Sequence, residues 1–157
     1  MPYAIMRFEK RKGGPASATE KHHERKKERY ASNPDVDTDR SHLNYHLIQP
    51  QHKYYAEIQS RIERAQRENP KCKVRRDSVK FIDTIVTATP EYLDHLPLEQ
   101  VRRYFERALD FFKTEVGEAN IFSAVVHMDE RNPHMHLCFV PLTQDNRLSA
   151  KEVIGGR

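Results

Sequence analysis

Residues 121–140 read IFSAVVHMDERNPHMHLCFV, and the interpretation of the whole chain starts from this stretch. Two apolar runs, residues 121–126 and 137–140, flank a polar segment that reads DERNP at residues 129–133. A pattern of this kind predicts two strands joined by a turn. We expect the two strands to pair as a hairpin.

Three histidines lie near the turn end of this predicted hairpin. Side chains alternate across a strand, so His127 shares a face with Val125, and His134 shares a face with His136 and Cys138. The three imidazoles converge if the two strands pair. The opposite faces carry apolar side chains that are expected to pack on a core: Phe122, Ala124, Val126, Met135, Leu137 and Phe139.

Three imidazoles on one face are a typical donor set for a divalent metal ion. Neutral imidazole is the commonest metal ligand in proteins, and three protein ligands with an open position are typical of a catalytic site. We therefore expect His127, His134 and His136 to bind one ion. We expect this ion to be Mn²⁺ in preference to Mg²⁺, because imidazole suits softer ions. The alternative is that they are half-buried polar residues of a sheet. Asp129 and Glu130 either orient the metal ligands or form only a polar turn.

The composition indicates one domain of 157 residues with a net charge of +4. No apolar run approaches the roughly 20 residues that a membrane-spanning helix needs, and the N-terminus lacks a signal-peptide pattern. Two cysteines, Cys72 and Cys138, are too few for a disulfide framework, which favours a reducing cytoplasm. Cys138 is expected to be buried and not to bind the metal.

Basic residues are concentrated in two segments. Residues 7–29 contain nine Lys and Arg residues against four Glu residues, and a second cluster spans residues 71–76. Two such clusters beside a metal site favour a polyanionic partner over a merely solvated surface. The candidate DNA-binding residues are Arg7, Lys10, Arg11, Lys12, Lys26, Lys27, Tyr45, Lys73, Arg75 and Arg76. Tyr45 is expected to stack a base or to line the site.

The remaining pattern alternates between strands and helices. Strands are expected at residues 3–8, 43–48 and 79–88, and helices at residues 17–31, 54–66 and 98–116. Ser17 and Ser149 each begin a capping-box pattern, so a further helix should start near the end of the chain. The order predicts an α+β fold in which helices pack against a largely antiparallel sheet.

Helical spacing predicts which side chains of each helix face inward. In the first helix, His22 shares a face with Arg25, whereas His23 points about 100° away. The expected apolar stripe of the second helix is Tyr55, Ile58, Ile62 and Ala65. The expected stripe of the third helix is Leu98, Val101, Phe105, Ala108, Phe112 and Val116.

Five segments of the chain resemble one known family. They read YAIMRFEKRKGG, KHHERKKERYASNPD, RSHLNYHL, RRDSV and NIFSAVVHMDERNPHMHLCFVPL, and they occur in the order found in the MobV (Mob/Pre) plasmid relaxases. The pattern H-x-D-E-x2-P-H-x-H at residues 127–136 is the most specific of these similarities. Its His-Met-His element also resembles that of the wider HUH nuclease superfamily.

The resemblance implies a metal-dependent relaxase that nicks one strand at a plasmid origin of transfer and initiates mobilisation. It implies that the metal ligands are His127, His134 and His136. It assigns the nucleophile to His22 of the H-x-E-R motif, which would stay joined to the 5′ phosphate, with Glu130 close enough to orient it.

The resemblance also bears on the partners of the chain. It implies a partner that is origin-of-transfer DNA, single-stranded or in a hairpin. Family members carry further C-terminal regions for dimerisation and membrane association. The chain is therefore expected to be the N-terminal relaxase domain of a longer protein, without a dimerisation region or a membrane contact of its own.

Other residues were candidates for the chemistry. Arg25, one helical turn from His22, has the geometry to clamp a phosphate. Relaxases outside this family use tyrosine, but Tyr54 and Tyr55 are more consistent with packing or DNA contact than with a nucleophile.

Three alternative functions are distinguishable. A rolling-circle replication initiator of the same superfamily would share the chemistry and differ in the DNA that it serves. A binding-only repressor of the origin would bind DNA without nicking it. A zinc protease is disfavoured because the chain lacks H-E-x-x-H.

Overall fold

A computed structural model of the chain describes residues 4–12, 16–26 and 36–155. Five strands form one sheet in the order β1-β3-β5-β4-β2, and every neighbouring pair is antiparallel. The strands are β1 (Ala4–Arg11), β2 (Tyr45–Ile48), β3 (Phe81–Ala88), β4 (Ile121–His127) and β5 (His134–Phe139). The predicted α+β fold with an antiparallel sheet is confirmed.

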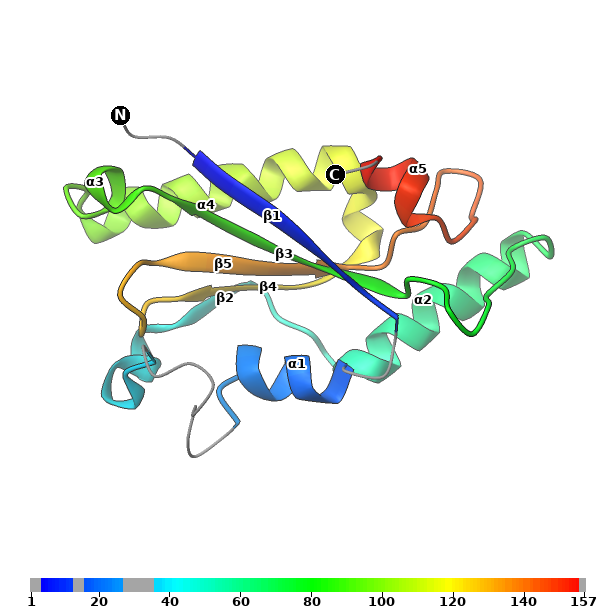
Figure 1. The fold of residues 1–157 in the computed structure, drawn as a ribbon, viewed down its shortest axis with the longest axis horizontal. Coiled ribbons are helices and arrows are strands. Elements are labelled where there is room, and N and C mark those ends of the chain that lie inside the picture. The colour runs from blue at the N-terminus through cyan, green and yellow to red at the C-terminus, as the bar shows by residue number, and fades with distance from the viewer. Residues whose placement is uncertain (1–3, 13–15, 27–35, 156–157) are drawn as a thin grey trace.

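Helices cover both faces of the sheet (Figure 1). The α-helices are α1 (Ala16–His23), α2 (Tyr54–Glu68), α3 (Pro90–Leu93), α4 (Leu98–Phe112) and α5 (Ala150–Ile154). Shorter elements are the 3-10 helix η1 (Thr38–Leu43), the π-helical turn η2 (Lys113–Gly117) and the 3-10 turn η3 (Glu118–Asn120). In Figure 1, α4 and α5 lie on one side of the sheet and α1 on the other.

Helix α4 forms the larger hydrophobic core with one face of the sheet. Its buried side chains pack with apolar residues of β3, β4 and β5, among them Ile82, Val126 and Leu137. The buried stripe is Val101, Phe105, Leu109 and Phe112, and Val116 extends it into η2. Leu98 was expected in this stripe, but it is the first residue of the helix and is 74% exposed. Leu109, not the predicted Ala108, completes the buried face.

Helix α2 packs with the start of α1 on the other face. Tyr54 is fully buried and Tyr55 is 68% exposed, so the predicted stripe began at the wrong tyrosine. Both residues lie within one turn of Ile58, and spacing alone does not separate them. The hydroxyl of Tyr54 donates to Glu24 at 2.7 Å and lies 3.2 Å from the Ser123 hydroxyl, which makes its burial possible.

A bulge interrupts the alternation of β4. The pairing with β5 shifts between Ile121 and Ser123, and Phe122 packs against Tyr54 and Phe81. Phe122 was predicted to share a face with Ala124, but an extra residue in one strand resets the alternation. Phe122 therefore belongs to the core under α2, on the same face as the histidines.

Helix α1 is shorter than predicted, and α5 forms as expected. The helix ends at His23, and Arg25 has a positive φ of 54°, which helical residues do not adopt. The part of the predicted helix at residues 27–31 lies outside the described residues. Ser17 lies inside α1 instead of capping it, whereas Ser149 accepts a hydrogen bond from the Glu152 amide and caps α5.

The described residues contain no helix that is both long enough and apolar enough to cross a membrane.

Two leucines of α4 provide a test of this packing. Leu109 is 5% exposed within the core, and Leu109→Ala should lower the free energy of unfolding by about 2–5 kcal/mol because it leaves a cavity. Leu98→Ala is the matched control and should change it by less than about 0.5 kcal/mol. Urea unfolding followed by circular dichroism measures both. Equal losses for the two variants would contradict the assignment of the buried face.

Candidate active site

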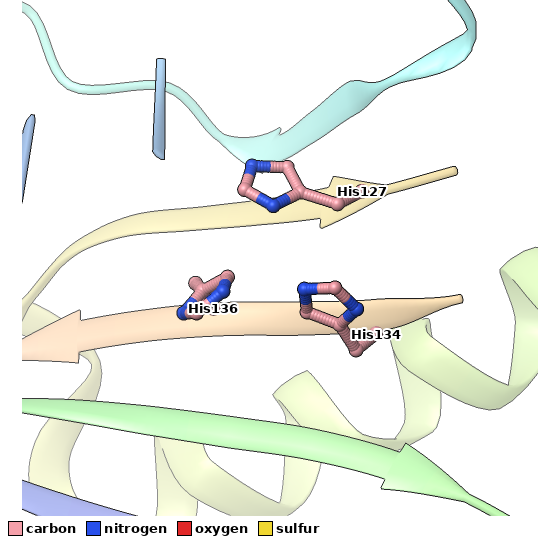
Figure 2. A group of neighbouring side chains, drawn as sticks. All are labelled: His127, His134 and His136. Carbon is pink, nitrogen blue, oxygen red and sulfur yellow. The ribbon is translucent and has the colours of Figure 1, made fainter. Parts of the chain in front are cut away.

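Three histidine rings converge on the hairpin of β4 and β5. His127 ends β4, His134 begins β5, and the register places these two residues opposite each other. The ring centroids are 5.4 Å apart for His127 and His134, and 5.0 Å from His136 to either of them. Figure 2 shows the rings approaching one another from the two neighbouring strands. One donor atom from each ring lies within 4.8 Å of the others, so the predicted convergence is present.

Each ring has one nitrogen held by an acceptor outside the cluster. His127 Nε2 donates to the main-chain carbonyl of His23 at 2.7 Å, and His134 Nδ1 donates to that of Asn132 at 3.0 Å. His136 Nδ1 donates to Asp83 Oδ1 at 3.1 Å. Carbonyl and carboxylate oxygens only accept, so these nitrogens carry the protons in the neutral rings.

The remaining nitrogens are the candidate metal donors, and one of them, His134 Nε2, contacts Glu130 Oε2 at 3.1 Å. They are Nδ1 of His127 and Nε2 of His134 and His136. His127 Nδ1 is buried without a hydrogen-bond partner in the described part of the chain, and Glu130 Oε2 lies 3.6 Å away. Buried polar atoms are rarely left unpaired unless a ligand or a function requires it. The donor set therefore fits a divalent ion held by three imidazoles.

Burial keeps two of the three rings neutral. It lowers the pKa of His127 and of His136 to about 4, so both are unprotonated at neutral pH. Burial acts in the same direction on His134, but the Glu130 carboxylate, 3.1 Å from its Nε2, raises the pKa of His134 overall. Glu130 thus lies at the edge of the space that the three inner nitrogens share.

His22 stands beside this cluster at the end of α1. Its ring centroid is 6.3 Å from those of His127 and His136. Burial lowers the pKa of His22 to about 4, and the charge of Arg25 contributes in the same direction. Arg25 Nη1 lies 3.4 Å from His22 Nε2. A guanidinium only donates, so this contact favours the tautomer in which Nε2 carries a lone pair.

Arg25 is held by carboxylates and does not have the predicted geometry of a phosphate clamp. Its Nε and Nη2 donate to the two oxygens of Asp129 at 2.7 and 2.8 Å, and Nη2 also donates to Glu130 at 2.8 Å. Nη1 donates to the carbonyl of His22 at 2.9 Å. Asp129 is fully buried, and Arg25 and Ser41 hold the pKa of its carboxyl well below the usual range against the effect of burial. Asp129 is therefore more than a polar turn residue.

His23 does not point away from the site, as its helical position suggested. It is buried, its Nε2 lies 3.0 Å from Asp83 Oδ2, and its ring centroid is 4.0 Å from that of His136. The prediction was wrong because α1 ends here, and its last turn packs on the sheet with both histidines. Sequence analysis also missed Asp83, although a single carboxylate within the β-rich run FIDTIVTA was a usable signal.

Glu20 in α1 and Glu24 directly after it attach this helix to the rest of the fold. Glu20 Oε1 accepts from the Tyr54 amide at 2.9 Å, at the start of α2. Glu24 Oε2 accepts from the Tyr54 hydroxyl, and Glu24 Oε1 lies 2.7 Å from His46 Nε2 on β2. Burial and these contacts raise the pKa of the Tyr54 hydroxyl far above its usual value, which makes it a poor nucleophile.

The predicted DNA-binding residues are distributed over both faces of the sheet. Arg7 pairs with Ile85, which pairs with His136, so Arg7 lies in the same row as that histidine. Lys10, three residues further along β1, projects from the opposite face. Tyr45 also packs on the α4 side, with the Arg102 guanidinium 4.7 Å from its ring, and it does not line the histidine face.

The other predicted DNA-binding residues that the structure describes form ion pairs with glutamates or lie away from the histidine cluster. Lys26 Nζ contacts Glu20 at 2.6 Å, and Arg11 contacts Glu9 at 2.5 Å. Lys12 is exposed beyond the end of β1, and Lys27 lies outside the described residues. The cluster of Lys73, Arg75 and Arg76 precedes β3, at the end of the sheet opposite the hairpin turn. Cys138 is buried, as predicted, and is not one of the three converged ligands.

Comparison with solved structures places this fold in a known class. The MobM relaxase domain, described as MOBV and Mob_Pre, superposes with a TM-score of 0.89 and 34% sequence identity. The match covers 97% of this chain and 76% of that one. That crystal structure is Mn-bound, at pH 6.8, and contains plasmid pMV158 oriT DNA. The fold is therefore that of a relaxase domain.

Sequence comparison then gives the family. The model of the family Mob_Pre, plasmid recombination enzyme, matches residues 1–157, and the chain belongs to this family. It is 37% identical over 159 residues to plasmid recombination enzyme type 1 of Staphylococcus aureus, covering 100% of this chain and 39% of that protein. It is 40% identical over 151 residues to a plasmid recombination enzyme of Bacillus thuringiensis, covering 96% of this chain and 33% of that protein. The chain thus spans less than half the length of these relatives.

The protonation of His22 provides a direct test of the site. Because burial and Arg25 lower its pKa to about 4, the ring should remain neutral as pH falls through 6.5, where an unperturbed histidine takes up a proton. NMR of the metal-free protein should show the His22 ring resonances at their neutral positions from pH 7.5 down to 5. A titration midpoint near 6.5 would contradict this description of the site.

Proposed function

We propose that this chain is the nicking domain of a plasmid relaxase. It cleaves one DNA strand at an origin of transfer and remains joined to the 5′ phosphate through His22. The observation that carries the proposal is that the His22 ring lies 6.3 Å from two of the three converged imidazoles. Burial and the charge of Arg25 lower the pKa of His22 to about 4, which leaves the ring neutral at pH 7. The likeness to a relaxase domain solved with oriT DNA supports it.

The three inner histidine nitrogens would hold a divalent ion, and they fit Mn²⁺ better than Mg²⁺. Imidazole donors suit Mn²⁺ better than Mg²⁺, and the related MobM structure is Mn-bound. A bound ion supplies Lewis acidity toward the oxygens of the scissile phosphate. Glu130 and His134 would have to separate for the ion to bind, because their contact occupies one of the inner nitrogens.

The bond changes follow from the His22 tautomer. Nε2 attacks phosphorus with its lone pair, so a P–N bond forms while the bond from phosphorus to the 3′ oxygen breaks. The 3′ oxygen leaves with the bonding electrons and takes a proton from solvent, which gives a free 3′ hydroxyl. No base is needed at Nε2, because that nitrogen carries no proton when Arg25 faces it, and the ring keeps its proton on Nδ1. The 3.4 Å contact with Arg25 Nη1 has to open so that the Nε2 lone pair can reach phosphorus.

The carboxylates of the hairpin turn act on Arg25. Asp129 binds the guanidinium at two points, and Glu130 binds it at a third. This fixes the guanidinium beside Nε2 and the carbonyl of His22. Sequence analysis assigned the orientation of His22 to Glu130, and we now assign it to Arg25, held by both carboxylates.

A nicking assay tests the proposed function. Purified protein should relax a supercoiled plasmid that carries the cognate origin in the presence of Mn²⁺ and should be inactive in excess EDTA. His134→Ala removes one ligand and should abolish nicking while largely retaining DNA affinity, which phosphate contacts supply. His95→Ala, an exposed histidine outside the cluster, is the control and should nick like the wild type. Full activity in EDTA would sink the proposal, and binding without nicking would favour a repressor.

Arg7 and Lys10 test which face of the sheet binds DNA. Arg7→Glu should weaken binding of a single-stranded origin oligonucleotide and reduce the slope of log affinity against log salt by about 0.7. Lys10→Glu makes the same charge change on the opposite face and should have a clearly smaller effect. Fluorescence anisotropy over a series of NaCl concentrations measures both. Equal effects would show that the histidine face is not the binding face.

A further inference from the structure

Among the buried histidines of the described residues, His23 is the one to which the proposed reaction assigns no role. It follows the nucleophile directly and is only 2% exposed, enclosed between α1 and the sheet. A buried histidine without a function usually satisfies its own hydrogen bonds and nothing more. His23 instead takes part in the hydrogen bonds that orient two of the proposed metal ligands, His127 and His136.

The first contact runs through the main chain. The carbonyl of His23 accepts the hydrogen bond from His127 Nε2 at 2.7 Å. This bond sets the tautomer of His127 and turns its Nδ1 toward the cluster. The position of α1 therefore determines the orientation of His127.

The second contact runs through the side chain. His23 Nε2 lies 3.0 Å from Asp83 Oδ2, and the other oxygen of Asp83 accepts from His136 Nδ1 at 3.1 Å. Asp83 is 3% exposed, so its carboxylate needs donors within the protein, and these are the two rings and, more weakly, the Cys138 thiol at 3.8 Å from Oδ1. Hydrogen bonds thus connect three side chains in series: His23 of α1, Asp83 of β3 and His136 of β5.

We propose that His23 is a positioning residue that couples the nucleophile helix to the metal ligands, so that metal binding and the placement of His22 stabilise each other. The inference rests on the metal site proposed above. Residues that orient metal ligands typically contribute 10–100-fold to metal affinity. Coupling between two sites is reciprocal, so an ion that holds His127 and His136 in place also holds the end of α1.

The same residues could be interpreted as a second metal site. His23, Asp83 and Cys138 offer donor atoms within 4.8 Å of one another. However, both oxygens of Asp83 and the Nε2 of His23 are already engaged, and the Cys138 thiol lies 3.7 Å from His23 Nδ1. We therefore expect one ion for each chain, bound by the other three histidines.

Isothermal titration with Mn²⁺ tests the side-chain contact. His23→Leu removes the donor to Asp83 and should weaken Mn²⁺ binding by about 10–100-fold. His23→Gln places an amide where Nε2 stood and should recover most of the loss. Thr84→Val is the control, because it alters the neighbouring residue of β3 on the opposite face, where the hydroxyl has no hydrogen-bond partner among the described residues. It should bind Mn²⁺ like the wild type.

Urea unfolding of each metal-free variant separates lost affinity from lost folding. If His23→Leu does not fold, Asp83→Asn interrupts the same chain with an isosteric side chain and should give the same loss of affinity. In the double variant His23→Leu and Asp83→Asn, the two losses of Mn²⁺ affinity should not add, because both residues act through one path.

Hydrogen exchange tests the coupling itself. Mn²⁺ should increase the protection of the amides at the end of α1 in the wild type and in Thr84→Val, and much less in His23→Leu. Three results would overturn the inference. One is a folded His23→Leu variant that binds Mn²⁺ as tightly as the wild type. The others are a His23→Leu variant in which Mn²⁺ protects the α1 amides as much as in the wild type, and a wild-type chain that binds two ions. A wild-type chain that binds no Mn²⁺ would instead overturn the metal site on which it rests.

Discussion

The structure of the site depends on the hydrogen bonds made by the outer nitrogens of three histidine rings. Each outer nitrogen donates to an acceptor from a different part of the fold: the end of α1, the hairpin turn and β3. Because one nitrogen of each ring is held, the other must face the centre of the cluster. The sheet order, which sets β5 between β3 and β4, brings two of these acceptors within reach, and the packing of α1 supplies the third.

Burial gives these rings their chemistry. It lowers the pKa of His22, His127 and His136, so each presents a lone pair at neutral pH. Arg25 carries a permanent positive charge in the site, and two carboxylates of the hairpin turn bind it. The left-handed backbone at Arg25 has a steric cost, and its guanidinium contacts with Asp129 and Glu130 offset that cost. The end of α1 and the hairpin turn are thus one unit, joined through Arg25.

The sequence predicted what depends on local patterns. Strand alternation gave the histidine hairpin, and apolar spacing gave most of the buried face of α4. The wrong predictions share one cause. Local sequence patterns allowed more than one side chain to face the core, and tertiary contacts determined which one does. Polar partners for a hydroxyl selected Tyr54 over Tyr55, and a bulge reversed the side of Phe122. The same holds for His23, because where α1 ends is set by Arg25 and its carboxylates, which lie about a hundred residues away in the chain.

The central claim is that His22 forms the covalent bond to DNA, and the chemical stability of that bond tests it most directly. The adduct between the protein and a nicked origin oligonucleotide can be trapped, exposed to mild acid and mapped by peptide mass spectrometry. A bond to an imidazole nitrogen is labile in acid, whereas a bond to a tyrosine oxygen survives. The account predicts an acid-labile adduct at His22 that His22→Ala cannot form and Tyr54→Phe still forms. An acid-stable adduct, or one that maps to a tyrosine, would contradict it.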